Sequence, residues 1–122
     1  MTTSQEIAPE IPVLTSLPVG FSASGVAAKI KKNGKPDVAM IVSDLPCAGA
    51  AVFTTNRAKA APVLRGMAQM AADPNAFRAI VINAGCANAC TGAQGKRNAE
   101  TTARLAAKAL KVKASQVLVM ST

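Results

Sequence analysis

The pattern of apolar and polar positions changes near residue 19. Residues 1–18 mix polar side chains with prolines and follow neither a helix nor a strand period, which predicts an extended or disordered lead-in. Regular apolar patterns run through residues 19–122, and a segment of this length can bury one hydrophobic core. We therefore expect one domain over residues 19–122.

Apolar stretches in the first half of this domain predict a β-meander. Residues 21–32 and 37–44 read as strands on either side of Asn33 and Gly34, which favour a tight hairpin because both tolerate positive φ angles. After a break at Pro46, residues 51–54 predict a third strand.

Residues 60–74 predict the first helix. Val63, Met67 and Met70 recur there at helical spacing until the stop at Asp73 and Pro74. Residues 77–85 then form a short, nearly continuous apolar run rich in β-branched residues, which predicts a strand buried on both faces.

Residues 94–111 predict the clearest helix. One face of this helix is apolar and consists of Ala99, Ala103, Ala106 and Leu110. A second face is charged and faces solvent, and it consists of Glu100, Arg104 and Lys108. Residues 116–122 read as the last strand. Because two strands joined through a helix favour a right-handed parallel βαβ unit, the pattern predicts an α/β fold with an N-terminal meander, a helix and a βαβ unit.

Composition narrows the classes of function. Lys and Arg number 14 against 6 Asp and Glu, a formal charge of +8 that favours anionic partners. Single-strand nucleic-acid binders stack bases on aromatic side chains, and this chain has 3 Phe and no Trp or Tyr. Solvated charge with an acidic small-molecule substrate is therefore the favoured interpretation, and a non-catalytic basic binding module is the alternative.

Cysteine count and the N-terminus bear on location. Cys47, Cys86 and Cys90 are an odd set without a disulfide pattern, which favours a reducing compartment. The first residues lack a basic segment followed by an apolar one, and no run of about 18 apolar residues exists to span a membrane. These features predict a cytoplasmic protein.

The stretch "NAGCANACTGAQG", residues 83–95, lies between a predicted strand and a predicted helix. Cys86 and Cys90 could bind a metal or act in redox chemistry, but the chain has no His to complete a zinc site, and we interpret both thiols as small buried residues. Gly92 and Gly95 open the helix and could bind an anion. A plain turn with Asn88 or Thr91 as the N-cap is the favoured interpretation.

Longer segments carry a family resemblance. Residues 20–44, "AAVFTTNRAKAAPV" at 50–63, "VINAGCANACTGAQG" at 81–95 and "VLVMST" at 117–122 resemble, in this order, the N-terminal part of the ornithine acetyltransferase family. These are bifunctional glutamate N-acetyltransferases of arginine biosynthesis. The resemblance implies a layered α/β sandwich whose remainder lies outside this chain.

The resemblance also implies an activity and partners. Family members cleave themselves before a threonine, which becomes the nucleophile of a β chain and carries acetyl from N-acetylornithine to glutamate. Some members also accept acetyl-CoA. No metal or cofactor is expected, and the implied assembly contains two α and two β chains without nucleic acid or membrane.

Thr122 is the one catalytic residue that the resemblance assigns here. In the family, the strand that "VLVMST" matches ends in Ser-Thr-Gly, whose Thr and Gly form the oxyanion hole. The nucleophile and the substrate-binding residues lie beyond Thr122, and the chain is shorter than a family α chain. We therefore expect this chain alone to be inactive and poorly stable. Cys86 stands where the family often has Asn, which weakens any role for its side chain.

Overall fold

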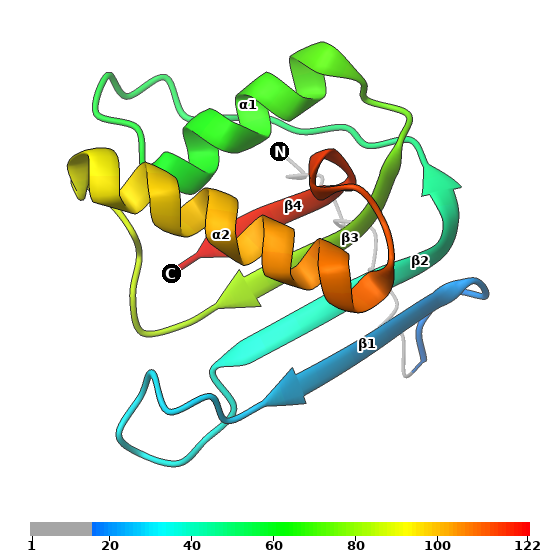
Figure 1. Ribbon diagram of the computed structural model, residues 1–122, viewed down its shortest axis with the longest axis horizontal. Helices are drawn as coiled ribbons and strands as arrows, with labels where there is room; N and C mark the ends of the chain where they lie inside the picture. Colours follow the sequence, from blue (N-terminus) through cyan, green and yellow to red (C-terminus); the bar gives the residue numbers. More distant parts are fainter. Residues whose placement is uncertain (1–15) are drawn as a thin grey trace, which may run out of the picture.

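The computed structural model describes residues 16–122, so most of the predicted lead-in lies outside the described residues (Figure 1). The elements in chain order are β1 (Phe21–Val26), β2 (Val38–Cys47), α1 (Ala61–Ala72), β3 (Phe77–Asn83), α2 (Gly92–Leu110), η1 (Ala114–Gln116) and β4 (Val117–Ser121). The predicted class, with strands and helices in one layered α/β unit, is confirmed.

The strands form one mixed sheet in the order β1-β2-β3-β4. Neighbouring strands from β1 to β3 run antiparallel, whereas β3 and β4 run parallel and are joined through α2. Figure 1 shows α1 and α2 side by side over one face of this sheet. The predicted parallel βαβ arrangement is therefore confirmed.

The core lies between α2 and the covered face of the sheet. Ala103 on α2 and Val117 on β4 are fully buried at its centre. Small helical residues let the helix approach the strands closely, as the alanine-rich face predicts. The other buried members are Ala79, Val81, Ala106, Ala107 and Val119, with Leu110 packed against them.

The opposite face of the sheet is apolar but uncovered. Side chains alternate across a strand, so residues next to the buried positions of β3 and β4 point away from the helices. None of these residues is fully buried, and Met120 is 52% exposed. The expectation that residues 77–85 are buried on both faces is therefore wrong for this chain, because no layer within residues 16–122 covers the second face.

The predicted hairpin forms, but not around a tight turn. Val26 pairs with Val38, so residues 27–37 make a long loop instead of a turn at Asn33 and Gly34. The buried Asp37 holds this loop, since its carboxylate accepts hydrogen bonds from the backbone N–H groups of Ala28 at 2.6 Å and Lys31 at 2.8 Å. The hydrogen bonds to the buried Asp37 carboxylate therefore favour a long loop over the tight turn that Asn33 and Gly34 predict.

The third strand of the predicted meander is the other correction. Residues 51–54 are not a strand, and β3 takes the third place in the antiparallel series. No backbone hydrogen bond within the described part of the chain pairs this segment with a strand, and Val52 is 98% exposed. β2 instead continues through Pro46, where pairing with β3 shifts register and needs no N–H from proline.

Helix α1 lies within the predicted range of residues 60–74 but is shorter and has a different buried face. Its buried residues are Ala61, Pro62 and Gly66, whereas Met67 is 37% exposed. The helix packs on β4 and α2, and its small residues are the buried ones, whereas Val63 and Met70 are only partly buried. Within the described residues, no helix is long and apolar enough to cross a membrane.

Candidate functional site

The carboxyl ends of β3 and β4 meet at one edge of the sheet, where the corner of residues 84–91 leads into α2 (Figure 1). Ligand sites of open α/β sheets lie outside the carboxyl ends of parallel strands. Asn83 pairs with Ser121 across these ends. Thr122 therefore lies beside the corner that contains Cys86 and Cys90.

Both backbone groups of Thr122 bond to this corner. Its N–H donates to the carbonyl of Asn83 at 3.0 Å, and its carbonyl accepts from the N–H of Gly85 at 2.7 Å. No hydrogen bond among residues 16–122 uses the Thr122 hydroxyl, and the residue is exposed. Any hydrogen bond that Thr122 donates to a ligand must therefore come from its hydroxyl.

Left-handed backbone shapes the corner. Asn88 and Cys90 have φ angles of 52° and 57°, and Gly85 and Gly92 have 104° and 59°. Gly85 is required there for a second reason, because a Cβ would lie 3.0 Å from Cγ of Lys31. The loop of residues 27–37 thus packs against the corner beside Thr122.

Asn88 and Thr91 order the start of α2, although neither acts as a conventional cap. Thr91 occupies the N-cap position without a side-chain cap bond, and its hydroxyl donates to Oδ1 of Asn88 at 2.5 Å. Asn88 Nδ2 donates to the carbonyl of Gly95 at 2.9 Å. The turn interpretation fits this geometry, and the anion-binding alternative has no contact that supports it.

The thiols of the corner differ from expectation. Cys86 and Cys90 are exposed, so their interpretation as small buried residues is wrong. The side chains of Asn83 and Asn88, and not the thiols, hold this region, since they donate to the carbonyls of Cys86 and Gly95. Within residues 16–122, no three His, Cys, Asp or Glu side chains gather in a way that could hold a metal ion.

Among the residues that the structure describes, Asp37 is the one group near this edge with a perturbed pKa. The hydrogen bond from the backbone N–H of Lys31 lowers the pKa of Asp37 below its usual value, and burial opposes this shift. The N–H groups of Ala28 and Ile30 and the charge of Lys31 add to the lowering. The backbone carbonyl of Asp37 also accepts a hydrogen bond from the N–H of Ala84, so this residue holds the loop by its carboxylate and the corner by its backbone.

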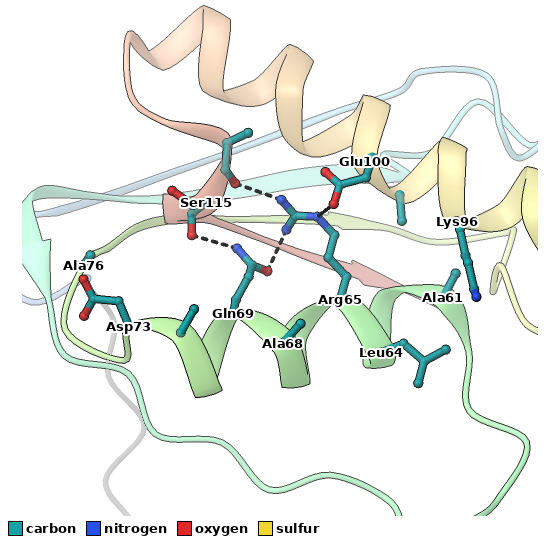
Figure 2. Close-up of a pocket in the computed structure, with 13 residues that line it drawn as sticks. Ala61, Leu64, Arg65, Ala68, Gln69, Asp73, Ala76, Lys96, Glu100 and Ser115 are labelled. Carbon is teal, nitrogen blue, oxygen red and sulfur yellow. Dashed lines mark hydrogen bonds and ion pairs between the residues drawn. The ribbon is translucent and has the colours of Figure 1, made fainter.

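A cleft of about 560 Å³ lies between α1 and α2 (Figure 2). Arg65, 9% exposed at its side chain, donates to the carbonyls of Val117 at 2.7 Å and Ala114 at 2.9 Å, and its Nε lies 3.1 Å from a Glu100 oxygen. Gln69 donates to the Ser115 carbonyl at 2.8 Å. These bonds tie α1 to the start of β4.

This cleft is separate from the edge at Thr122. With a rise of roughly 3.3 Å per strand residue, Val117 and Thr122 lie about 16 Å apart along β4. Both terminal nitrogens of Arg65 donate hydrogen bonds to protein oxygens, and its Nε forms an ion pair with Glu100. The Arg65 network in this cleft is therefore structural and lies away from the candidate chemistry at Thr122.

The protein is an α+β protein with a mixed sheet and one parallel strand–helix–strand unit. The candidate site lies at the carboxyl ends of β3 and β4, where Asn83 and Thr122 lie. A family model described as the ArgJ family matches residues 22–122. The chain belongs to the ArgJ family.

Relatives and solved structures agree with this assignment. The arginine biosynthesis bifunctional protein ArgJ of Thermotoga neapolitana is 48% identical over 106 residues, which cover 87% of this chain and 26% of that protein. The protein of the same name from Thermobifida fusca is 51% identical over 106 residues, 86% of this chain and 27% of that protein. The chain thus spans about a quarter of the length of these relatives.

Two crystal structures share the fold. Arginine biosynthesis bifunctional protein ArgJ of Bacillus halodurans matches with a TM-score of 0.80 and 35% identity, over 85% of this chain and 53% of that one. Ornithine acetyltransferase of Mycobacterium tuberculosis, complexed with ornithine, matches with a TM-score of 0.81 and 42% identity, over 86% of this chain and 56% of that one.

Proposed function

We propose that this chain is the N-terminal part of an acyltransferase that moves acetyl from N-acetylornithine to glutamate. The match of residues 22–122 to the ArgJ family carries this proposal. It is supported by relatives named as bifunctional arginine biosynthesis proteins and by the structural likeness to an ornithine acetyltransferase complexed with ornithine. Acetyl transfer from acetyl-CoA to glutamate is proposed as the second reaction of the bifunctional enzyme.

In the proposed reaction, a threonine at the N-terminus of the β chain is the nucleophile. Its hydroxyl attacks the acetyl carbonyl, ornithine leaves as the amine, and the amine of glutamate then attacks the acyl-enzyme ester. The α-amino group of the same threonine takes and returns the proton. This chemistry needs no histidine, and we propose that it needs no metal or cofactor.

Thr122 is proposed to donate its hydroxyl to the oxyanion that forms in each step. Its N–H and carbonyl are held by Asn83 and Gly85, so its hydroxyl projects from a fixed backbone at the exposed strand end. A preorganised donor of this kind lowers the activation barrier by roughly 3 to 4 kcal/mol in comparable acyl-transfer sites.

The uncovered sheet face supports a partner from the same precursor. Six apolar residues share this face and alternate with the buried positions: Ala39, Ile41, Ile80, Ile82, Leu118 and Met120. Covering such side chains contributes roughly 25 cal/mol per Å² of apolar surface. We propose that the region downstream in the family covers this face within an α2β2 assembly, and that this chain alone is inactive and poorly stable.

A chimeric enzyme tests the proposal. In this chimera, residues 17–122 of this chain replace the matched segment of the Thermotoga neapolitana relative. Purified chimera should form N-acetylglutamate and ornithine from N-acetylornithine and glutamate, measured by mass spectrometry. A folded, self-cleaved chimera that transfers no acetyl would contradict the proposal. The 122-residue chain by itself serves as the control and should show no transfer.

A further inference from the structure

The side chain of Asn83 connects the end of β3 to the end of β4. Its Oδ1 accepts a hydrogen bond from the Ser121 hydroxyl at 2.7 Å, and its Nδ2 donates to the carbonyl of Cys86 at 2.8 Å. Its backbone carbonyl accepts from the N–H of Thr122 at 3.0 Å. A single residue therefore contacts both the corner and the last two residues of the strand end.

This arrangement fixes the rotation of β4 about its own axis. Successive side chains of a strand point to opposite faces, so the direction of the Ser121 side chain sets the direction of the Thr122 side chain. A strand end with one neighbouring strand frays unless it is tied down. The bond between Ser121 and Asn83 ties the side chain, in addition to the backbone bonds of Thr122.

We propose that Asn83 is a positioning residue that aims the Thr122 hydroxyl at the oxyanion, acting through Ser121. The inference rests on the proposed function, because it concerns the same acetyl transfer. It assigns to Asn83 no contact with the substrate. Its second bond, to Cys86, keeps the corner in the shape that brings Gly85 to Thr122.

The effect of Asn83 should be on the rate more than on stability. The bond to Ser121 lies at the partly exposed edge of the sheet, outside the buried cluster around Val117. Losing it removes one neutral hydrogen bond near the surface, whereas a small misalignment of a catalytic donor can lower the rate by up to about a hundredfold.

Four variants of the chimeric enzyme test this inference. Ser121→Ala should lower kcat by about 3-fold to 10-fold and Asn83→Ala by about 10-fold to 100-fold, each with KM within about twofold of the parent. Ser121→Thr keeps the hydroxyl donor and should retain kcat within about twofold. The double variant Asn83→Ala/Ser121→Ala should be no slower than Asn83→Ala, because both remove the same contact.

Ser115→Ala is the matched control, since it removes a hydroxyl near the other end of β4 and should leave kcat unchanged. Circular dichroism and the thermal midpoint report folding for each variant. If Asn83→Ala does not fold, the comparison of Ser121→Ala with Ser121→Thr decides. Equal kcat for these two variants, or a loss of kcat that only follows the folded fraction, would overturn the inference.

The parent chimera separates this inference from the proposed function. A folded parent without acetyl transfer overturns both. An active parent whose kcat is insensitive to Ser121→Ala overturns only the role of Asn83, and leaves the acyltransferase proposal standing.

Discussion

Replacing Gly95 by alanine perturbs the corner at its most crowded point. A Cβ on Gly95 would overlap the Thr91 hydroxyl and the side-chain oxygen of Asn88, and it would lie 2.6 Å from Cβ of Thr91. Gly95 is buried in the first turn of α2, so the methyl group has no open space to occupy. The hydrogen-bonded pair of Asn88 and Thr91 must therefore move.

The magnitude follows from what must shift. Two hydrogen bonds are disturbed, from Thr91 to Asn88 and from Asn88 to the Gly95 carbonyl, each contributing about 1 kcal/mol. Overpacking adds about 1 to 3 kcal/mol, and alanine in place of glycine within a helix returns up to about 1 kcal/mol. We expect a net destabilisation of about 2 to 4 kcal/mol.

Thermal unfolding of the chimeric enzyme, followed by circular dichroism, measures this loss. Gly66→Ala is the matched control, because Gly66 is also a buried helical glycine. Its Cβ would meet only the Phe53 ring, at 3.3 Å, and this ring lies on a segment without strand pairing. Gly95→Ala should unfold several degrees below the parent, and Gly66→Ala within about a degree of it. Equal midpoints for the two variants would refute the reasoning.

Four further predictions concern other parts of the chain. Asp37→Asn should flatten the fall of the thermal midpoint below about pH 5, because a lowered pKa gives stabilisation that is present above the unfolded-state pKa and lost as pH falls through the folded-state pKa; an unchanged pH profile would argue against it. In the isolated chain, amides of residues 52–55 should exchange with solvent within minutes, much faster than those of β3, and comparable protection by mass spectrometry would show that this segment is paired. Arg65→Met should destabilise the chimera by about 2 to 4 kcal/mol by removing two charge-assisted hydrogen bonds, to the carbonyls of Ala114 and Val117, yet leave kcat of the folded enzyme unchanged; a large fall in kcat would connect the cleft to the chemistry. Replacing Cys86 and Cys90 together by alanine should keep acetyl transfer within about twofold, and its loss would restore a role for the thiols.

The second half of the fold is predictable from local patterns. The apolar run of β3, the alanine face of α2 and the β4 pattern each specify the type of element, although the run of β3 does not show that only one of its faces is covered. The parallel pairing of β3 and β4 follows from the helix that joins them.

The first half is less predictable because distant contacts decide it. Asn33 and Gly34 favour a tight turn, but the buried carboxylate of Asp37 binds amides six and nine residues away and holds a longer loop. Residues 51–54 have strand-forming side chains without a partner strand in the described part of the chain. Strand propensity alone cannot supply a neighbouring strand.

Part of the candidate site is likewise predictable from the local sequence, and part depends on distant contacts. The corner is visible in the sequence through its glycines and Asn88, whereas Thr122 gains a role only by family resemblance. The contacts of Asn83 with Ser121 and Thr122 require the parallel register of two strands separated by 38 residues, measured between Asn83 and Ser121. A spacing this long carries no local signal.

The most direct test of the central claim is the rate of acetyl transfer by the chimeric enzyme with and without the Thr122 hydroxyl. Thr122→Val keeps the β-branched shape and the backbone bonds to Asn83 and Gly85 but removes the donor. We predict that kcat for transfer from N-acetylornithine to glutamate falls by about 100-fold to 1,000-fold, with the thermal midpoint unchanged. A Thr122→Val enzyme that keeps kcat within twofold of the parent would contradict the claim that this chain supplies an oxyanion donor.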